Sequence, residues 1–191
     1  MIERIIELDK KALVFLNGLG SPAFDAFWLF ITKQLYWTPF FLLLVFLLQK
    51  KIGWKQLGIV TLFIALLLLI GNETIEKLCK PFFQRLRPCN DPEIKDIIRI
   101  VHQSNTFSFF SGHAANSMST MMFIYLILKK HYKYTFLIFL YPLIFAYSRI
   151  YLGVHFPGDI LTGYAVGATL GFVFYKIYQK TQQKYFPEDS L

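Results

Sequence analysis

The sequence is poor in the residues that build metal centres and disulfide frameworks. Its 191 residues include two cysteines, Cys79 and Cys89, and four histidines. Neither cysteine has the cysteine and histidine neighbours of a zinc site, so we expect no zinc centre around them. The two cysteines flank a basic segment, and a disulfide between them on an oxidising face of a membrane stays open as an alternative.

Charged residues are also scarce, and those of negative sign are the scarcer. They make up 17% of the chain, with 12 aspartates and glutamates against 20 lysines and arginines, so the formal net charge is +8. A basic balance can indicate a nucleic-acid partner, but here many lysines stand in short segments between apolar runs. That pattern is typical of the cytoplasmic loops of membrane proteins. We therefore expect no nucleic-acid partner.

The chain also lacks internal repeats, low-complexity tracts and the pattern of a cleavable signal peptide. Met1 to Lys11 carries acids and bases, with no apolar core and no small-residue cleavage site. The length suits one domain and hardly two. We therefore expect a single membrane-embedded domain over residues 1–191.

Apolar residues, in contrast, are abundant. Of the chain, 55% is hydrophobic and 18% is aromatic, and phenylalanine alone occurs 21 times. Several apolar runs approach the roughly 20 residues that a helix needs to cross a bilayer. The sequence therefore predicts an all-α, polytopic transmembrane helical bundle with five to six spans, at about 23–48, 54–72, 112–128, 134–147 and 160–178.

Two segments near the N-terminus depart from simple spans. Residues 1–20 place isoleucines and leucines at helical spacing opposite charged residues, which predicts an amphipathic helix in the membrane interface. Residues 23–48 carry the polar stretch Thr32–Gln34 and the Thr38-Pro39 pair. This stretch therefore either crosses once with a kink or is split into an interfacial piece and a shorter span.

Lysine-rich segments set the predicted orientation. Those at 50–55, 129–133 and 176–184 fall on one face of the bundle, while segments 80–107 and 149–159 fall on the other. Because short lysine-rich loops stay in the cytoplasm, we expect the second face to look toward a periplasm or the cell exterior. The protein is thus predicted to be integral to a membrane, which we interpret as a bacterial inner membrane.

Three clusters of polar residues gather on that outer face. Charged side chains between apolar runs are costly in a membrane protein and indicate a functional site. The clusters are Lys80 with Arg87-Pro88, then Ser111-Gly112-His113, and then Arg149 with His155 and Asp159.

Phosphoryl transfer is the chemistry that needs such a set. Its transition state spreads negative charge over the phosphoryl oxygens, so catalysis is mostly positioning and electrostatic stabilisation. Lys80, Arg87 and Arg149 would surround these oxygens. Ser111 and the backbone N–H of Gly112 stand where a helix begins, and a helix N-terminus binds anions readily.

Two histidines permit a division of labour between nucleophile and proton donor. His155 is the candidate nucleophile because Asp159, in the first turn of the following helix, can hold its other ring nitrogen. His113 is then the candidate general acid. Arg85 is expected to be solvated or to add charge near the phosphate, and Asn116 faces either the pocket or a neighbouring helix.

Together the three clusters resemble the signature motifs of the type 2 phosphatidic acid phosphatase superfamily, which includes membrane lipid phosphatases and vanadium haloperoxidases. The resemblance covers about residues 54–178, and the order and internal spacing of the motifs agree. One position departs, because Phe110 stands where the second motif usually opens with proline. The resemblance implies a metal-independent enzyme without a cofactor, a phosphohistidine intermediate on His155, and an antiparallel helical bundle with its site near the outer membrane surface.

The function we expect is that of a membrane lipid phosphatase whose partners are a phosphorylated lipid and the bilayer. The candidate substrates are phosphatidic acid, phosphatidylglycerol phosphate, an isoprenoid diphosphate such as undecaprenyl diphosphate, and a lipid A-type glycolipid. A lipid phosphotransferase with a lipid or sugar acceptor, and a non-enzymatic lipid-binding membrane protein, remain as alternatives. The sequence leaves the oligomeric state open.

Overall fold

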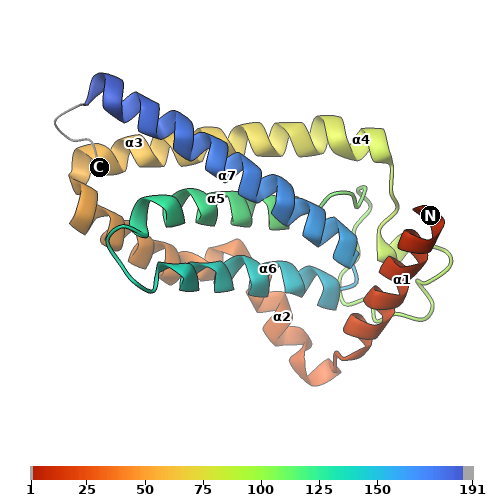
Figure 1. Ribbon diagram of the computed structural model, residues 1–191. Helices are drawn as coiled ribbons and strands as arrows, with labels where there is room; N and C mark the ends of the chain where they lie inside the picture. The colour runs from red at the N-terminus through yellow and green to blue at the C-terminus, as the bar shows by residue number, and fades with distance from the viewer. Residues whose placement is uncertain (1, 187–191) are drawn as a thin grey trace.

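The computed structural model describes residues 2–186, which form helices and connecting loops (Figure 1). This confirms the predicted all-α class. The α-helices are α1 (Ile2–Gly18), α2 (Asp25–Ile31), α3 (Thr38–Thr74), α4 (Lys80–Phe83), α5 (Gly112–Leu128), α6 (Leu140–Tyr151) and α7 (Pro157–Tyr185). Short 3-10 helices lie at Pro22–Phe24, Gln34–Trp37, Pro88–Asn90 and Thr135–Phe139, and a π-helical turn, Ile75–Cys79, joins α3 to α4.

Helix α3 consists of two arms that meet at Gly53. The backbone of Gly53 has φ 73° and ψ 172°, outside the helical region. Glycine adopts a positive φ without the steric cost that a side chain brings. The first arm runs away from α2 and the second returns toward α4 (Figure 1). The break falls where the sequence places lysines between two apolar runs, so the two predicted spans meet in a tight turn.

The stretch 23–48 is divided, as one of the two sequence interpretations has it. Helix α2 ends at Ile31, the 3-10 helix Gln34–Trp37 follows, and the long apolar helix begins at Thr38. Thr32, which is awkward for a lipid-facing helix, stands at the break and its hydroxyl accepts a hydrogen bond from Arg149 at 2.6 Å. Thr32, one of the polar residues that interrupt this stretch, therefore binds the end of α6.

Fewer segments than the predicted five to six meet the length and composition of a membrane span. Two do so by themselves, Gln34–Asn90 and Pro157–Tyr185, and a bent pair formed by Ile2–Gly18 and Pro22–Ile31 would make a third. The reason is geometric. The two arms of α3 count as one segment although the chain reverses between them, and α5, with 17 residues, falls short of the roughly 20 that a perpendicular crossing needs.

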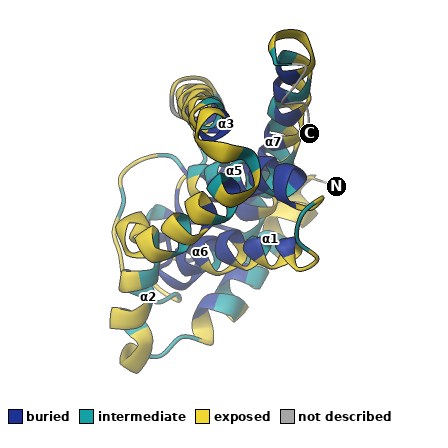
Figure 2. Ribbon diagram, turned by 90° about the vertical axis from the view of Figure 1, so that its left-hand side faces the viewer, coloured by how far each residue is buried: buried dark blue, intermediate teal, exposed yellow. Residues whose placement is uncertain are grey.

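The outer surface of the bundle is apolar. Figure 2 shows exposed residues over most of α3, a mixture of exposed and intermediate residues over α2, and buried ones concentrated in α6. Many of the exposed residues are large and hydrophobic, including Leu42, Phe46, Leu62 and Leu69 of α3 at 56–63% exposure. Such a surface is costly in water and is expected where hydrocarbon is the solvent.

Helix α1 forms as predicted, but it is docked on the protein as well as being amphipathic. Ile2, Ile5 and Ile6 are exposed, whereas Leu13 and Asn17 are fully buried. The side-chain amide of Asn17 donates to the carbonyls of Arg99, Ile150 and Tyr151, and its oxygen accepts from the backbone N–H of Arg99. Helix α1 therefore closes one end of the bundle (Figure 1).

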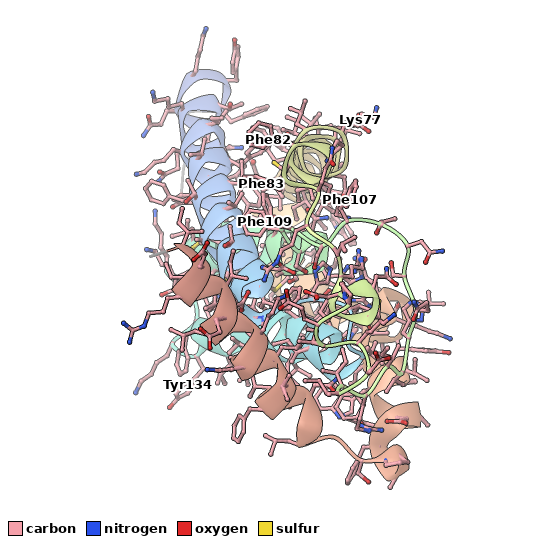
Figure 3. The ribbon with its side chains drawn as sticks, turned by 90° about the vertical axis from the view of Figure 1, so that its right-hand side faces the viewer. Lys77, Phe82, Phe83, Phe107, Phe109 and Tyr134 are labelled. Carbon is pink, nitrogen blue, oxygen red and sulfur yellow. The ribbon has the colours of Figure 1, made fainter. Side chains whose placement is uncertain are left out.

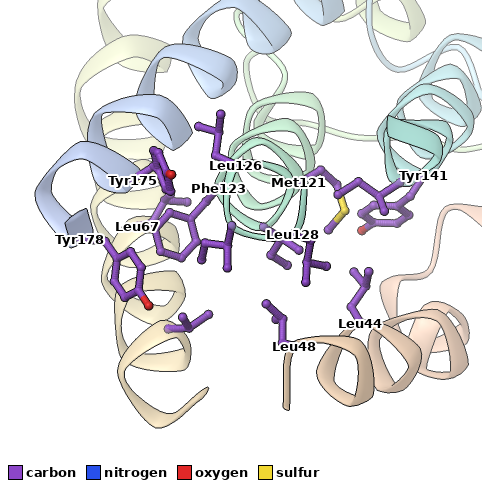
Figure 4. Packing of buried hydrophobic residues seen from close by; sticks show 14 of the residues in the cluster. Leu44, Leu48, Leu67, Met121, Phe123, Leu126, Leu128, Tyr141, Tyr175 and Tyr178 are labelled. Carbon is purple, nitrogen blue, oxygen red and sulfur yellow. The ribbon is translucent and has the colours of Figure 1, made fainter. Parts of the chain in front are cut away.

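The main hydrophobic core lies where α3, α5, α6 and α7 meet (Figure 4). Helix α5 runs through its centre, and Met121, Phe123, Ile127 and Leu128 of this helix are at most 1% exposed. Residues of the neighbouring helices complete the cluster, among them Leu44, Leu48, Leu67, Tyr141, Tyr175 and Tyr178.

Helices α5 and α7 approach closely through a row of glycines. Gly163, Gly167 and Gly171 recur every fourth residue and face the backbone of α5. A Cβ atom at Gly163 would lie 2.8 Å from the carbonyl oxygen of Ser111, closer than carbon and oxygen can approach. Small residues at this spacing let two helices in a membrane pack backbone to backbone.

Alanine at Gly167 should therefore destabilise the protein. Its Cβ would press on the backbone of Ala115 in α5, and overpacking of this kind costs about 1–3 kcal/mol. Gly58→Ala in α3 is the matched control, because no atom lies within 4 Å of a Cβ there and alanine is the better helix former. Thermal unfolding in detergent should show a lower midpoint for Gly167→Ala and an equal or higher one for Gly58→Ala. Equal shifts in both variants would contradict the packing role of the glycine.

Candidate active site

The three sequence clusters meet at the end of the bundle that carries α1, α4 and the loops around them (Figure 1). Helices α5 and α7 both begin there, and α6 ends there. Figure 3 views the molecule from this end, with Phe82 and Phe83 of α4 beside Phe109 of the loop before α5. The rings of Phe83 and Phe109 pack edge to face at 4.7 Å.

His155 and Asp159 form a buried pair at the start of α7. Their side chains are 2% and 0% exposed, and Nδ1 of His155 lies 3.3 Å from Oδ2 of Asp159. Helix α7 begins at Pro157, and Oδ2 of Asp159 also accepts the backbone N–H of Phe156 at 3.0 Å. The aspartate thus caps its own helix while it faces the histidine, as predicted for a residue in the first turn.

Arg87 lies on the other side of the His155 ring. Its Nη1 is 3.1 Å from Nε2 of His155 and donates to the carbonyl of Val154 at 3.0 Å. The remaining donors are held by Thr106, with Nε on the carbonyl and Nη2 on the hydroxyl, both at 2.9 Å. An arginine only donates and an ionised carboxylate only accepts. We therefore assign the proton to Nδ1 of His155, with the lone pair of Nε2 directed at Arg87.

Burial lowers the pKa of His155 to about 4, and the positive charges of Arg87 and Arg149 add to the effect. Asp159 acts in the opposite direction but does not outweigh burial. At neutral pH the ring is therefore uncharged, which leaves a lone pair available for nucleophilic attack.

Ser108 is a buried member of the site that sequence reasoning missed. Its hydroxyl donates a short hydrogen bond to Oδ2 of Asp159 and lies 3.3 Å from Nδ1 of His155. Ser108 stands among phenylalanines in the loop before α5 and carries no motif of its own. Only the fold of this loop brings it to the pair.

Arg85 contradicts the expectation of a solvated residue or a phosphate ligand. Its Nη1 lies 2.7 Å from Oδ1 of Asp159, and its Nη2 lies 2.7 Å from Oδ2 of Asp9 in α1. The guanidinium also stacks over the ring of Phe156 at 3.9 Å. Arg85 therefore binds the aspartate of the pair.

The second cluster begins α5. Ser111 is the N-cap, and its hydroxyl accepts the N–H of Ala114 at 3.4 Å. Its own backbone N–H donates to the carbonyl of Asp159 at 3.2 Å, which ties the second cluster to the third. Phe110, at the position where the resemblance expects proline, is buried against Ile75 and Ala115 and so anchors the loop before Ser111.

The other cationic residues of the clusters are buried at the same end. Lys80, the first residue of α4, is 7% exposed, and Arg149 near the end of α6 is 8% exposed. The guanidinium Nε of Arg149 is buried without a hydrogen-bond partner in the described part of the chain. Arg87, Lys80 and Arg149 all act electrostatically on His113. The structure therefore places positive charge around both histidines.

A cavity of about 510 Å³ extends from His113 into the bundle. Gly112, Asn72 and Asn116 lie at its polar end, where Nδ2 of Asn116 donates to Oδ1 of Asn72 at 2.5 Å. Asn116 thus faces both the pocket and a neighbouring helix. Apolar side chains from both arms of α3, from α5 and from α6 line the rest, including Leu44, Leu48, Val60, Ile64, Leu68, Ile124, Tyr141 and Phe145. The volume lies within the usual range of small-molecule sites.

Cys79 and Cys89 are both free thiols in the structure. Cys89 is buried and its sulfur contacts the carbonyl of Ser104 at 3.7 Å. The structure therefore does not contain the disulfide that the sequence left open between these two cysteines.

The protonation of His155 can be measured directly. The chain has four histidines, so ¹⁵N labelling of histidine gives few signals. The signals that disappear in His155→Asn are those of His155. We expect that ring to stay neutral from pH 7 down to about pH 4, because burial opposes its charge. A midpoint near the ordinary histidine value of about 6.5 would contradict the buried, arginine-flanked environment.

Known proteins resemble this chain in sequence and in fold. The sequence profile of the PAP2 superfamily matches residues 57–183. The chain is 34% identical to a lipid A 4'-phosphatase of Bacteroides thetaiotaomicron, over 94% of this chain and 81% of that one. It is 32% identical to a lipid A 4'-phosphatase of Porphyromonas gingivalis, over 93% of this chain and 75% of that one.

A solved structure has the same fold. The crystal structure of a transmembrane PAP2 type phosphatidylglycerolphosphate phosphatase from Bacillus subtilis superposes with a TM-score of 0.66 at 22% identity, covering 97% of this chain and 89% of that one. The profile match, the identities to the two phosphatases and the transmembrane fold lead to one conclusion: the chain belongs to the PAP2 superfamily and is a membrane lipid phosphatase.

Proposed function

We propose that the protein removes a phosphate from a phosphorylated lipid through a phosphohistidine intermediate on His155, at the face of the membrane that is turned away from the cytoplasm. The observation that carries this proposal is the state of the His155 ring. It is buried, oriented by Asp159 through Nδ1, and directs Nε2 at the guanidinium of Arg87. An uncharged imidazole with one nitrogen anchored and the other beside a phosphate-binding arginine is prepared to attack phosphorus.

The first half-reaction begins when phosphate oxygens take the donors of Lys80, Arg87 and Arg149 and the N-terminus of α5 at Ser111 and Gly112. Arg87 then releases Nε2 and binds oxygen instead. Nε2 attacks phosphorus in line as the bond to the lipid oxygen breaks. The positive charge on the phosphorylated ring is stabilised by Asp159 through Nδ1–H.

His113 gives a proton to the leaving lipid oxygen in that step. The negative charge of the bound phosphate favours the protonated ring that a general acid needs. In the second half-reaction a water attacks the phosphohistidine and passes a proton to His113. The P–N bond breaks, inorganic phosphate leaves, and His155 is again neutral. These steps use no metal ion or cofactor.

For the membrane we propose five crossings, made by the two arms of α3, by α5, by α6 with the 3-10 helix before it, and by α7. The turn at Gly53, the α5–α6 loop and the C-terminal end of α7 lie together at one end of the bundle (Figure 1). The lysine-rich segments are at this end, so the positive-inside rule makes it cytoplasmic. The site then faces a periplasm or exterior, across a bacterial inner membrane. Exposed Phe82 and Phe83 at the opposite end suit the membrane interface (Figure 3).

A lipid A-type glycolipid is the first candidate substrate. Two relatives that match more than nine-tenths of this chain are lipid A 4'-phosphatases. Phosphatidylglycerol phosphate, an isoprenoid diphosphate and phosphatidic acid follow as candidates. In each case the apolar cavity beside His113 would receive hydrocarbon of the lipid while the cationic loops hold its phosphate.

Phosphate release from these four lipids by detergent-purified protein tests the mechanism. With EDTA present, we expect release from at least one lipid, and a loss of about 10⁴-fold or more in His155→Ala, as for other catalytic nucleophiles. His131→Gln, at the cytoplasmic end of α5, is the control and should keep full activity. Release that EDTA abolishes would contradict the metal-independent mechanism, and release unchanged in His155→Ala would contradict the nucleophile. Transfer to an added lipid or sugar in place of free phosphate would identify a phosphotransferase.

Filling the cavity should weaken binding of long-chain substrates. Ile64→Trp, which places an indole in the cavity from the second arm of α3, should raise the KM for a long-chain lipid phosphate by about tenfold, equivalent to about 1.4 kcal/mol. It should leave hydrolysis of a short, water-soluble phosphomonoester unchanged. Leu62→Trp on the exposed face of the same arm is the control, since Leu62 is 57% exposed. A KM that rises equally for both substrates, or in both variants, would contradict a tail site in this cavity.

A further inference from the structure

Arg85 contacts the catalytic pair through both its side chain and its backbone. Its Nη1 holds Oδ1 of Asp159 at 2.7 Å, and its carbonyl accepts the backbone N–H of Ser108 at 2.8 Å. Ser108 in turn donates to Oδ2 of Asp159. Arg85 therefore binds one carboxylate oxygen of Asp159 directly and positions Ser108, which binds the other.

Asp9 of α1 holds Arg85 from the opposite side. Its Oδ2 is 2.7 Å from Nη2 of Arg85, and its Oδ1 accepts the backbone N–H of Gly158 at 2.7 Å. A Cβ atom at Gly158 would lie 2.7 Å from the Asp9 carboxylate, so this close contact requires glycine. Asp9 thus joins Arg85 to the first turn of α7, which carries Asp159.

These contacts fix the orientation of the Asp159 carboxylate. If Oδ1 were free, the carboxylate could rotate and exchange the oxygen that faces Nδ1 of His155. With Oδ1 on Arg85, Oδ2 stays directed at His155, where Ser108 and the N–H of Phe156 also bind it. A bidentate-capable guanidinium suits this task because its planar donors can serve two carboxylates at fixed angles.

The charges also keep Arg85 away from the substrate. Arg85 stands between two carboxylates, those of Asp9 and Asp159, so turning to a phosphate would leave both without their cation. A carboxylate that loses its partner in a largely buried setting is costly. Arg85 therefore differs from Arg87, which binds Thr106, the carbonyl of Val154 and the His155 ring, and from Arg149, which binds the hydroxyl of Thr32.

We propose that Arg85 and Asp9 are positioning residues of the reaction, which act through Asp159 to hold His155 in its Nδ1–H form, and that α1 is for this reason a functional part of the phosphatase. The proposal rests on the role of His155 as the nucleophile. It does not concern phosphate binding, which Lys80, Arg87 and Arg149 provide.

Three variants test this, with phosphate release and histidine ¹⁵N spectra as readouts. Arg85→Gln removes the cation, Asp9→Asn keeps an oxygen for the N–H of Gly158 but loses the charge, and Lys10→Gln is the matched control. Lys10 neighbours Asp9 on α1 and pairs with Asp91 and Glu93, both at 2.8 Å, away from the catalytic pair.

We expect Arg85→Gln to lower kcat by about 10- to 100-fold, the range seen when an outer partner of a functional histidine is lost. KM and the inhibition constant of inorganic phosphate should not change. Asp9→Asn should act in the same direction with a smaller factor, and Lys10→Gln should match the wild type. The ¹⁵N signals of His155 should show the Nδ1–H tautomer in the wild type and a tautomer mixture in Arg85→Gln.

Several results would overturn the proposal. A raised KM or phosphate inhibition constant with unchanged kcat in Arg85→Gln would make Arg85 a phosphate ligand. If Lys10→Gln lowers kcat as much as Asp9→Asn does, both residues serve only to hold α1 in place. If Arg85→Gln does not fold, Arg85→Lys takes its place, and unchanged kcat in it and in Asp9→Asn overturns the proposal.

The spectra separate this proposal from the function it rests on. If the wild type releases no phosphate from any lipid, the proposed function fails, while the tautomer of His155 still decides the positioning role. A mixture in the Arg85 variant then supports it, and a single unchanged tautomer overturns it.

Discussion

The close contact between α5 and α7 is the constraint on which the site depends. Both helices begin at the site, α5 after its cap Ser111 and α7 at Pro157, so the distance between the two helices sets the distance between the start of α5 and His155. The glycine row on α7 makes that distance as short as two backbones permit. The hydrogen bond from Ser111 to the carbonyl of Asp159 exists only because of it.

Charge is arranged in two tiers around His155. In the inner tier, Arg85 stands between the carboxylates of Asp159 and Asp9, so each carboxylate faces a positive charge within the protein. In the outer tier, Arg87 and Arg149 bind uncharged oxygens, and their positive charge lowers the pKa of His155. In the proposed mechanism the inner tier orients the ring and the outer tier attracts an anion. A phosphate ester would then bind the outer tier without disturbing the inner one.

The sequence predicted the parts of the site that motifs encode, and the rest depends on tertiary structure. Residues such as His155 and Asp159 stand four apart, so their pairing is local. Ser108 and Arg85 contact the same aspartate from 51 and 74 residues away along the chain, and Asp9 holds Arg85 from a further 76 residues away. The sequence placed Arg85 in solvent or near the phosphate and not on Asp159, nothing in the local sequence marks Ser108, and Asp9 lies in a helix whose pattern predicts only a membrane-interface role.

The fold, like the site, can be predicted from the sequence only in part. The helical class and the position of four apolar runs follow from composition and periodicity, because hydrophobic runs of this length have few other structures open to them. The number of spans does not, because α5 and α6 are short and the chain reverses at a single glycine. The break at Thr32 could be anticipated from its polarity, but its contact with Arg149 could not.

The apolar cavity between the α3 arms, α5 and α6 has a thermodynamic consequence. A lipid tail that enters it moves from the hydrocarbon of the bilayer to the hydrocarbon of the protein, and such a transfer carries almost no hydrophobic free energy. The affinity of a tail would therefore come from its close packing in the cavity, which a bulkier lining side chain would disturb. Such a cavity would select lipid tails by their shape, while the loops at the end of the bundle would select the head group.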